Sequence, residues 1–336
     1  MKVNIYDVAK KSGLSVVTVS RVLNDAPSVR EKNRQRVMKA IEELDYRPNS
    51  AARSLARGKT GVIGLTLETL EDTVFDGVVR TVNESLEEHG YFLALSVHKE
   101  DDSQTGRQRN FLFQEDRVDG VMLLSPTNED NDVLELRKKR IPFVLIDNQN
   151  ADVKATTVNV DNYKGGYEAT KHLIELGHTR IGHICGTALY RSAQERKRGF
   201  EAALADAGLM PYAMANTEFG LRNGFDAVKA WISEKRVPTA LFAADDFIAL
   251  GAIQALQDEG YRVPSDVSVI GYDDQSFAGG IHPRLTTIRQ PIKQMGVQAV
   301  QLLLNMLNGT AKKNRSLLLE PELVVRESTS ICRVQL

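Results

Sequence analysis

The stretch IYDVAKKSGLSVVTVSRVLND, residues 5–25, decides how the first part of the chain folds. Val8 and Ala9 belong to an apolar face with helical spacing, and Gly13 then supplies a turn. Ser15 is a suitable N-cap for a second helix, because its hydroxyl can accept a hydrogen bond from a free backbone N–H. The stretch therefore predicts two short helices joined by a tight turn.

A third helix is predicted to follow. SVRE, residues 28–31, fits the S-x-x-E capping box, in which two side chains satisfy backbone N–H groups at a helix start. Val37, Ile41 and Leu44 would form the buried stripe of that helix. Residues 1–46 are thus expected to form a small all-α domain of the helix-turn-helix type.

The outer face of the second predicted helix suits DNA. Val16 and Val17 remain exposed once the core face is assigned, and two adjacent exposed valines are unfavourable in water. They fit a major groove, where apolar side chains contact thymine methyl groups and Arg21 can pair with guanine. Thr18 and Ser20 are placed to contact phosphates. The alternative is that both valines merely complete the small core.

The distribution of charge supports the DNA interpretation. Residues 1–59 hold 13 lysines and arginines against 6 acidic residues, although the whole chain has a net charge of −1. The remaining 277 residues hold 30 basic and 38 acidic side chains. The alternative to DNA binding is a basic face that only contacts water, which would be the better interpretation of a lone charged helix. A basic head on an acidic body is typical of a polyanion-binding domain attached to a second functional unit.

Two segments, IYDVAKKSGLSVVTVSRVLN at 5–24 and RVMKAIEELDYRPNSAARSL at 36–55, resemble the N-terminal region of the lac/gal repressor family of bacterial transcription regulators. The resemblance extends to about residue 328, so it covers nearly the whole chain. It implies a DNA-binding head followed by a body similar to periplasmic sugar-binding proteins. It also implies three chain crossings between two lobes, near residues 160, 290 and 320, with a helix at about 292–308 returning to the first lobe.

RPNSAARSLARGKTG, residues 47–61, has the features of a very short helix. About nine residues separate a possible cap at Asn49 from a stop at Gly58, and helices of this length are marginal in water. We expect the segment to fold only when DNA and a second copy are present. Leu55 is placed as an apolar wedge for a minor-groove step, a role that the resemblance also assigns to it. The candidate DNA-binding residues are Tyr6, Ser15, Val16, Val17, Thr18, Ser20, Arg21, Asn24, Asn49, Ala52, Arg53 and Leu55.

From Gly61 onward, strand-like runs alternate with amphipathic stretches, which predicts parallel sheets built from βαβ units. Two such series predict an α/β body of two doubly wound parallel-sheet lobes with a cleft between them. The strand-like runs are VIGLT, YFLALSV, GVMLLS and FVLID, then RIGHICG, AMANTEF, TALFAAD and VSVIGYDD. Helices are expected near residues 73–89, 103–114 and 131–139, then near 163–176, 191–207, 222–235 and 246–259. The expected domains are the head at 1–46, a hinge helix and linker at 47–59, and a two-lobed effector-binding and dimerisation domain at 60–336, with lobe one at about 60–160 plus 292–320 and lobe two at about 161–290.

Polar side chains gather where the predicted strands end, and ligands of such sheets bind beyond the carboxyl ends of the strands. Asp147, Asp245 and Asp273 each end a strand-like run. Carboxylates and an arginine such as Arg196 hydrogen-bond pairs of hydroxyls, and an aromatic face such as Phe219 stacks on a sugar ring. For each aspartate, capping of the following helix is the alternative. The resemblance implies effector contacts at Ile146, Asp147, Val160, Asp161, Ser192, Arg196, Phe219, Asp245 and Asp273, and Phe75 is a further candidate wall of the pocket.

One segment departs from the family pattern. Family members often carry Asn-Pro-Phe-Phe before the first helix of the body, whereas this chain has DTVF at residues 72–75. The resemblance therefore leaves the first-lobe side of the pocket, and with it the identity of the ligand, open.

Other chemistries lack the residues that they need. The GKT tripeptide before Gly61 lacks the glycine that a phosphate-binding loop requires five residues earlier. The six histidines do not have metal-ligand spacing, so His178 and His183 are interpreted as cap or core residues. Asp245 and Asp246 are not expected to share a proton, because adjacent residues of a strand point to opposite faces. We expect no metal, no cofactor and no enzymatic activity.

The cysteines and the hydropathy suggest where the protein works. Cys185 and Cys332 are far apart in sequence and are expected to be reduced. No apolar run is long enough to cross a membrane, and the N-terminus does not have the pattern of a signal peptide. The sequence therefore predicts a cytoplasmic protein.

The combined features predict a dimeric, ligand-controlled transcription regulator, a repressor that binds a pseudo-palindromic operator and is released by a small sugar-type inducer. One alternative is a regulator of the same fold that is activated by its ligand or by a phosphoprotein partner. Another is a sugar-binding protein without DNA function or a sugar-processing enzyme, against which the head and the lack of a catalytic set argue. The C-terminal residues 327–336 contain no leucine heptads, so we expect a dimer rather than a tetramer.

Overall fold

A computed structural model describes residues 3–24, 26–46, 59–69, 73–97, 111–114, 117–126, 129–150, 153–311 and 314–333. Contacts divide the chain into two compact units, residues 1–62 with 114–119 and all remaining residues. The first unit contains a three-helix head, and the second contains two lobes that are each built around one sheet. The head, lobe one and lobe two each have a hydrophobic core of their own.

The head contains the predicted helix-turn-helix. Its helices are α1 (Ile5–Ser12), α2 (Val16–Leu23) and α3 (Glu31–Glu43). Gly13 ends α1 in the left-handed conformation with φ 66°, which glycine adopts without strain. The hydroxyl of Ser15 accepts a hydrogen bond from the backbone N–H of Thr18 at the start of α2. Both predictions for the turn are confirmed. The buried core of the head consists of Val8, Ala9, Val19, Val22, Val37, Ala40 and Tyr46.

The capping box predicted at residues 28–31 is wrong. Ser28 is exposed, and α3 begins only at Glu31, with Arg30 at the N-cap and no side-chain cap. Val29 packs instead against the core of the head. Burial of this apolar side chain outweighs the capping hydrogen bond, so the helix starts after it.

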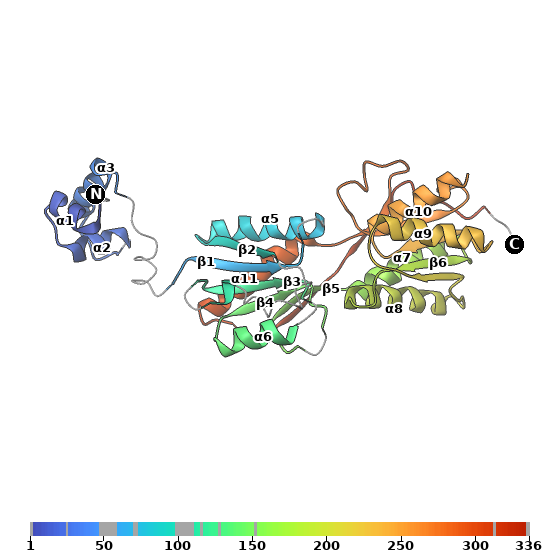
Figure 1. Cartoon of the computed structure of the whole chain (residues 1–336), viewed down its shortest axis with the longest axis horizontal. Coiled ribbons are helices and arrows are strands. Elements are labelled where there is room, and N and C mark those ends of the chain that lie inside the picture. The colour runs from blue at the N-terminus through green and yellow to red at the C-terminus, as the bar shows by residue number, and fades with distance from the viewer. Residues whose placement is uncertain are drawn as a thin grey trace, which may run out of the picture. The chain divides into compact units, whose positions relative to one another are not determined.

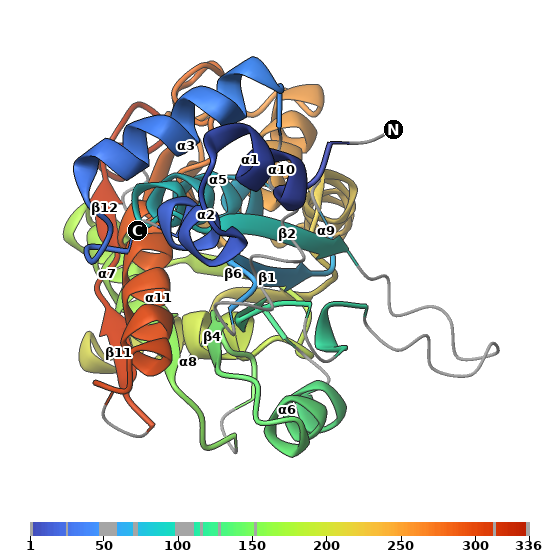
Figure 2. The same cartoon turned by 90° about the vertical axis from the view of Figure 1, so that its left-hand side faces the viewer.

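Lobe one is a sheet with helices on both faces (Figure 1). Its elements are β1 (Val62–Leu67), α5 (Thr73–Glu88), β2 (Phe92–Val97), η1 (Phe111–Phe113), β3 (Gly120–Leu124), α6 (Glu129–Lys138), β4 (Phe143–Ile146), β5 (Thr157–Val160), α11 (Ile292–Leu307) and β11 (Ser316–Leu319). The strand order is β11-β5-β4-β3-β1-β2, and every pairing from β11 to β1 is parallel. Figure 2 shows α5 and α11 on one face of the sheet and α6 on the other.

Lobe two repeats this architecture. Its elements are α7 (Asn162–Glu175), β6 (Ile181–Cys185), α8 (Arg191–Asp206), β7 (Ala213–Asn216), α9 (Leu221–Ser233), β8 (Ala240–Ala243), α10 (Asp246–Asp258), β9 (Ser268–Asp273), β10 (Thr286–Arg289) and β12 (Glu322–Val324). The strand order is β12-β10-β9-β8-β6-β7, in which only the pairing of β12 with β10 is antiparallel. Helices α7 and α8 cover one face, while α9 and α10 cover the other. The α/β class and the two sheets agree with the sequence prediction.

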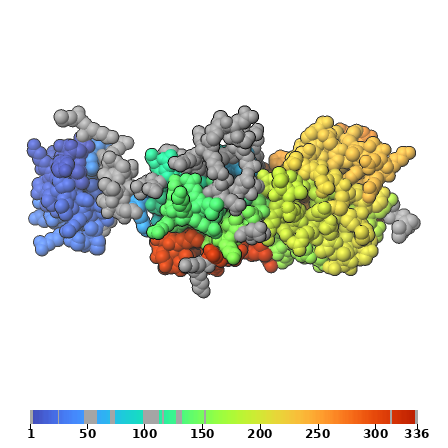
Figure 3. All heavy atoms as spheres, turned by 60° about the horizontal axis from the view of Figure 1, so that its bottom comes forward, coloured from blue at the N-terminus to red at the C-terminus, as the bar shows by residue number. Residues whose placement is uncertain are grey.

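The chain passes between the two lobes three times. β5 of lobe one leads into α7 of lobe two at Asp161, and β10 leads back into α11 at Gln290 and Pro291. β11 then leads into β12 at Glu320 and Pro321. Figure 3 shows one consequence, since red residues from near the end of the chain lie beside green residues of lobe one. Three short segments at the carboxyl ends of β5, β10 and β11 therefore join the lobes.

Several expected elements end earlier than the sequence suggests. β7 ends at Asn216, so Phe219 lies in the loop before α9. β8 ends at Ala243, so Asp245 also lies outside its strand. Residues 103–110 of the helix expected at 103–114 lie outside the described residues, and its last residues form the short 3-10 helix η1. Sequence patterns predict the presence of a helix or strand more reliably than the residues at which it begins and ends.

A fully buried histidine lies in the core of lobe two. His183 on β6 stacks on Phe242, with ring centroids 4.6 Å apart, and also contacts Phe200. Its Nδ1 lies 2.9 Å from the carbonyl oxygen of Phe242. Burial lowers the pKa of His183 from 6.5 to about 4, so the ring is neutral near neutral pH. His183 is the core residue that the sequence predicted.

The free energy of unfolding is expected to fall as the pH is lowered from 6.5 toward about 4. In this range His183 binds a proton in the unfolded chain but stays neutral in the folded protein. The folded pKa lies below the unfolded one, so this contribution is complete above the unfolded pKa and is lost below it. Between about pH 7 and about pH 5 the loss is about 2 kcal/mol. Urea titrations of the wild type and His183→Leu at both pH values measure it. The variant should be less stable near neutrality but less sensitive to acid, and equal pH dependence of the two proteins would contradict the assignment.

Candidate functional site

The outer face of α2 presents an apolar residue and a cation to solvent. Val17 is 60% exposed, and Arg21 one turn later is also exposed. Tyr6 on α1 is 70% exposed. The prediction of two exposed valines is wrong for Val16, which packs partly against the core of the head. One valine of the pair thus serves the core, and the other is left for a partner.

The remaining predicted DNA-binding residues of the head are placed around the same helix. The hydroxyl of Thr18 lies 2.9 Å from that of Ser15, so the two groups hold each other at the start of α2. Ser20 is half-buried, and Asn24 is the C-cap of α2. Asn49, Ala52, Arg53 and Leu55 lie outside the described residues.

Asp119 fixes the chain where it leaves the linker. Its Oδ1 accepts hydrogen bonds from the backbone N–H of Thr60 at 2.6 Å and from the Thr60 hydroxyl at 3.0 Å. Its Oδ2 accepts one from the backbone N–H of Gly61 at 2.9 Å. The sequence did not predict this anchor, because the two segments are far apart along the chain.

On the lobe-one side, polar groups meet at the carboxyl ends of β3 and β4. Asp147 follows β4 with φ 52°, and Ser125 follows β3 with φ 49°, so both turn sharply out of the sheet. The hydroxyl of Ser125 donates to Asp147 at 3.3 Å. Nε2 of Gln149 donates to the Asp147 carboxylate at 2.8 Å. The predicted Asp147 is therefore held in place by neighbours on its own lobe.

Two hydrogen bonds connect the lobes beside this cluster. Oε1 of Gln149 accepts from the backbone N–H of Ser192, at the start of α8 in lobe two, at 3.0 Å. The hydroxyl of Tyr190 donates to Glu68, which follows β1 in lobe one, at 3.1 Å. We call these contacts the lobe bridges. The sequence did not predict Gln149, Tyr190 or Glu68, and the only local hint is that Gln149 stands two residues after Asp147.

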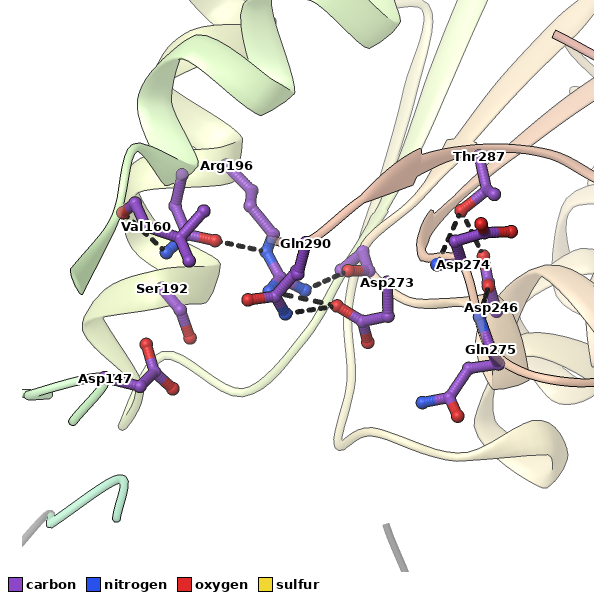
Figure 4. A network of polar contacts seen from close by, with 12 residues as sticks. Asp147, Val160, Ser192, Arg196, Asp246, Asp273, Asp274, Gln275, Thr287 and Gln290 are labelled. Atoms are coloured by element: carbon purple, nitrogen blue, oxygen red, sulfur yellow. Dashed lines mark hydrogen bonds and ion pairs between the residues drawn. The ribbon is translucent and has the colours of Figure 1, made fainter. Parts of the chain in front are cut away.

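On the lobe-two side, Arg196 is the centre of a buried network (Figure 4). Its Nε donates to Asn162 at 2.9 Å, and its Nη1 donates to the carbonyl of Ala244 at 2.6 Å. Its Nη2 lies 3.4 Å from the carboxylate of Asp273. The guanidinium also stacks on the Tyr272 ring, 3.6 Å from its centroid. Burial is the largest single effect and opposes the charged form, but Asp273, Tyr272 and further nearby carboxylates together outweigh it and keep the pKa of Arg196 above its ordinary value.

Asp273 links this network to a segment that joins the lobes. It is the last residue of β9 and has φ 108°, an unusual conformation for a residue with a side chain. Its Oδ1 accepts a hydrogen bond from Nε2 of Gln290 at 2.6 Å. Gln290 belongs to the crossing between β10 and α11. The predicted pair of Arg196 and Asp273 is brought together, and Gln290 is an additional member that the sequence did not reveal.

A close helix contact places Arg196. A Cβ atom on Gly166 of α7 would lie 2.1 Å from the backbone carbonyl oxygen of Arg196 on α8. Only glycine permits this approach, which brings the base of the arginine side chain against α7. The guanidinium then reaches Asn162, the first residue of that helix.

An aromatic pair lies at the carboxyl end of β6. The rings of Tyr190 and Phe219 are 5.8 Å apart at 58°. A Cβ atom on Gly186 would lie 2.4 Å from the Phe219 ring, so glycine is required beneath it. Phe75 at the start of α5 is half-buried and packs on the core of lobe one. Asp72 of the divergent DTVF segment lies outside the described residues.

Four predicted effector residues line one pocket of about 120 Å³, namely Asp147, Val160, Asp161 and Ser192. The other lining residues are Asn148, Asn159, Asn162, Tyr163, Arg191, Glu195 and Leu318. The wall therefore contains three carboxylates and one guanidinium, together with several amides. This arrangement combines residues of both lobes with a crossing segment.

Two other predicted residues have structural roles. Ile146 is fully buried in the core of lobe one, because β4 is a central strand covered on both faces, so its side chain is not a wall of the pocket. Asp245 caps α10, where its Oδ1 accepts the backbone N–H of Ile248 at 2.6 Å. Asp161 also caps a helix, through the backbone N–H of Lys164 at 2.9 Å, while lining the pocket.

A second buried carboxylate supports the loop that carries Asp273. Asp246, the first residue of α10, accepts hydrogen bonds from the Thr287 hydroxyl at 2.6 Å and from the backbone N–H of Gln275 at 2.7 Å. Burial raises its pKa well above the ordinary value of 3.8. The strand argument used for Asp245 and Asp246 is wrong, since both lie beyond β8, at the N-cap and first turn of α10.

Side chains associated with other chemistry have packing roles. His178 lies 3.1 Å from the hydroxyls of Thr239 and Ser268 and 3.0 Å from the carbonyl of Ser330, which holds the C-terminal segment on lobe two. Burial raises the pKa of the Cys185 thiol to about 11. Among the described residues, no cluster of three potential metal ligands exists. No helix in this part of the chain is long and apolar enough for a membrane span.

Comparisons with known proteins cover both units. A model described as "Bacterial regulatory proteins, lacI family" matches residues 4–49, and one described as "Periplasmic binding protein-like domain" matches residues 170–329. The chain is 37% identical over 334 residues to the HTH-type transcriptional repressor PurR of Haemophilus influenzae (strain Rd), with 96% of this chain and 98% of that protein covered.

Solved structures are similar over the same length. A lac repressor dimer bound to operator and the anti-inducer ONPF matches with a TM-score of 0.87 and 30% identity, covering 98% of this chain and 100% of that one. A complex of the transcriptional regulator CelR with cellobiose matches with a TM-score of 0.73 and 31% identity, covering 97% and 99%.

Arg196→Ala is expected to lower the free energy of unfolding by about 3–5 kcal/mol, because it leaves the Asp273 carboxylate buried without its cation. Arg198→Ala is the matched control on the same helix. Arg198 is at the surface and pairs with Glu195, so its loss should cost less than about 1 kcal/mol. Urea unfolding of both variants provides the comparison, and equal losses would show that burial of the ion pair is not the cause.

Proposed function

The chain belongs to the lacI family of bacterial regulatory proteins. We propose that it is a dimeric repressor that binds a pseudo-palindromic operator and is released by a small sugar-type inducer. The head would bind DNA, and the pocket beside the lobe bridges would bind the inducer. The observation that carries the proposal is the full-length similarity to a repressor dimer solved on its operator, which includes head and body in one chain. A relative that is itself a transcriptional repressor matches over the same span.

The head supports DNA reading by α2. Val17 offers an apolar surface for a thymine methyl group, and Arg21 offers paired donors for guanine. Both lie on the face opposite the core residues Val19 and Val22. The surplus of basic residues in the head would add phosphate contacts.

Lobe one offers a surface for the second copy. β2 is the edge strand of the sheet, and its side chains Phe92, Leu95 and Val97 are 74%, 44% and 46% exposed. An apolar edge strand of this kind is unfavourable in water unless another chain covers it. We propose that this strand belongs to the dimer interface, which would pair two heads on the two operator half-sites.

The pocket supports a neutral, hydroxyl-rich ligand. Asp147, Asp161 and Glu195 outnumber Arg191 in its wall, so a phosphosugar or a carboxylate would be repelled. Carboxylates accept hydrogen bonds from neighbouring hydroxyls, and amides both accept and donate them. Tyr190 directly precedes the lining residues Arg191 and Ser192, so its pair with Phe219 would extend the site with an apolar face. The bound cellobiose of the CelR complex is a ligand of this class in a similar chain.

We propose binding without turnover. The relatives are transcription regulators. The carboxylates of this site contact Gln149, Gln290 and Arg196 and are not arranged as a general acid and a general base on either side of a substrate bond. A repressor must reach bacterial DNA, so the proposed place of action is the cytoplasm.

Val17→Ala and Arg21→Ala are each expected to weaken operator binding by about fivefold or more, because each removes a contact to a base edge worth about 1–3 kcal/mol. Gel shifts on an operator selected from a random-sequence library provide the measurement. Met38→Ala is the control, since Met38 is an exposed apolar residue of α3 in the same head. Unchanged affinity in both α2 variants would refute the proposed reading helix.

A panel of neutral sugars should contain a ligand that raises the thermal midpoint of the wild type and lowers its operator affinity. Asp147→Asn should weaken that ligand at least tenfold, because the wall loses a charged acceptor. Asp226→Asn, on the exposed face of α9, should leave the ligand affinity unchanged. Tighter operator binding with the ligand would indicate a corepressor, and conversion of the sugar would indicate an enzyme.

A further inference from the structure

We propose that lobe one contains a second ligand site, for a small organic anion that carries a phosphate group, at the edge opposite the pocket of the lobe bridges. The site is a cavity of about 440 Å³ at the amino ends of β4, β5 and β11. This volume is in the range of cavities that bind small molecules. Its walls come from the ends of α6 and α11 and from the segments that lead into the three strands. The lining residues are Arg137, Arg140, Ile141, Pro142, Phe143, Lys154, Ala155, Thr156, Met306, Gly309, Ala311 and Asn314.

The charge of the lining is one-sided. Arg137, Arg140 and Lys154 contribute three cations, and none of the described lining residues is acidic. Residues 60–336 as a whole hold 38 acidic against 30 basic side chains, so this cavity runs against the charge of the body. Within the described residues, none of the three cations forms an ion pair. Such a group of guanidinium and ammonium donors suits a phosphate.

The carbonyl ends of neighbouring helices explain only part of this charge. Arg137 lies in the last turn of α6, and Arg140 follows it, so both favour the negative end of the helix dipole. Lys154 stands instead before β5, on a segment with no helix end of its own. Nη2 of Arg137 donates to the carbonyl of Lys154 at 2.6 Å, which fixes the two segments side by side. The three cations therefore come from two separate segments of the chain, which the fold brings together around the cavity.

One of the lining residues, Thr156, carries a buried hydroxyl. Thr156 is 3% exposed, and its hydroxyl has no hydrogen-bond partner among the described residues. The adjacent backbone is already used, since the carbonyl of Thr156 accepts the N–H of Leu145 at 3.0 Å.

The rest of the cavity is apolar, which sets the class of ligand. Ile141, Phe143 and Met306 are half-buried and present hydrocarbon and ring surface. An inorganic phosphate ion would leave these side chains uncovered. A phosphate ester of a small apolar or aromatic group would place its phosphate at the cations and its organic part on this surface.

Phenyl phosphate is a probe with both features, and phenol and inorganic phosphate each lack one of them. Calorimetric titration of the full chain should give a Kd for phenyl phosphate below about 1 mM, with at least tenfold weaker binding of each partial probe. Arg140→Gln combined with Lys154→Gln should weaken phenyl phosphate at least tenfold. Both residues are exposed, so the fold should be retained, and an unchanged thermal midpoint checks this.

Lys138→Gln is the matched control, since Lys138 is an exposed cation of α6 that does not line the cavity. It should leave the affinity for phenyl phosphate within twofold of the wild type. Asp147→Asn should leave it unchanged as well, which separates this site from the proposed sugar pocket. Absence of binding in the wild type, or equal binding in the double variant, would overturn the proposal. Weaker operator binding of the double variant without any phenyl phosphate binding would identify a DNA contact instead and would also overturn it.

Discussion

The body of this protein depends on the three segments that join its lobes at the carboxyl ends of β5, β10 and β11. Three neighbouring connections restrict relative motion of the lobes to rotation about them, because sliding would stretch at least one segment. Asp161 and Gln290 lie on two of these segments and also belong to the candidate site. A ligand that contacts these residues would therefore act on the joint itself, and a small displacement there would become a rotation of a whole lobe.

The lobe bridges decide how easily such a rotation occurs. Gln149 and Tyr190 each contribute one hydrogen bond across the lobes, and such bonds contribute about 1 kcal/mol net between neutral groups and about 1.5–3 kcal/mol where the acceptor is a carboxylate such as Glu68. Two bonds of this strength hold one arrangement without excluding another. A ligand changes the balance only through different affinities for the two arrangements, and it has the direct means to do so, since Ser192 both lines the pocket and takes part in a bridge.

The sequence predicted those features that repeat along the chain or follow from one element. The alternation of strands and helices gave both sheets, and the ends of strands located Asp147 and Asp273, because parallel strands end at one edge of a sheet. Val16 and Ser28 were misplaced where burial of a neighbouring apolar side chain competed with a local pattern. Gln149 and Tyr190 could not be predicted, because their partners belong to the other lobe and depend on how two folded bodies meet.

Charge separates the two ligand sites proposed for the body. The Arg196 guanidinium is surrounded by several carboxylates, with Asp273 the most influential, and the pocket wall adds Glu195, so the cleft side of the body is net negative. At the opposite edge of lobe one, Arg137, Arg140 and Lys154 surround a cavity whose described lining residues include no acid. A neutral sugar avoids the repulsion of the first site, and an anion is attracted only to the second. The strands of one sheet thus hold two sites of opposite preference at their two ends, and each ligand would be excluded from the other's site by charge before shape is tested. If both ligands bias the same rotation, linkage requires that each change the affinity of the other by the same factor.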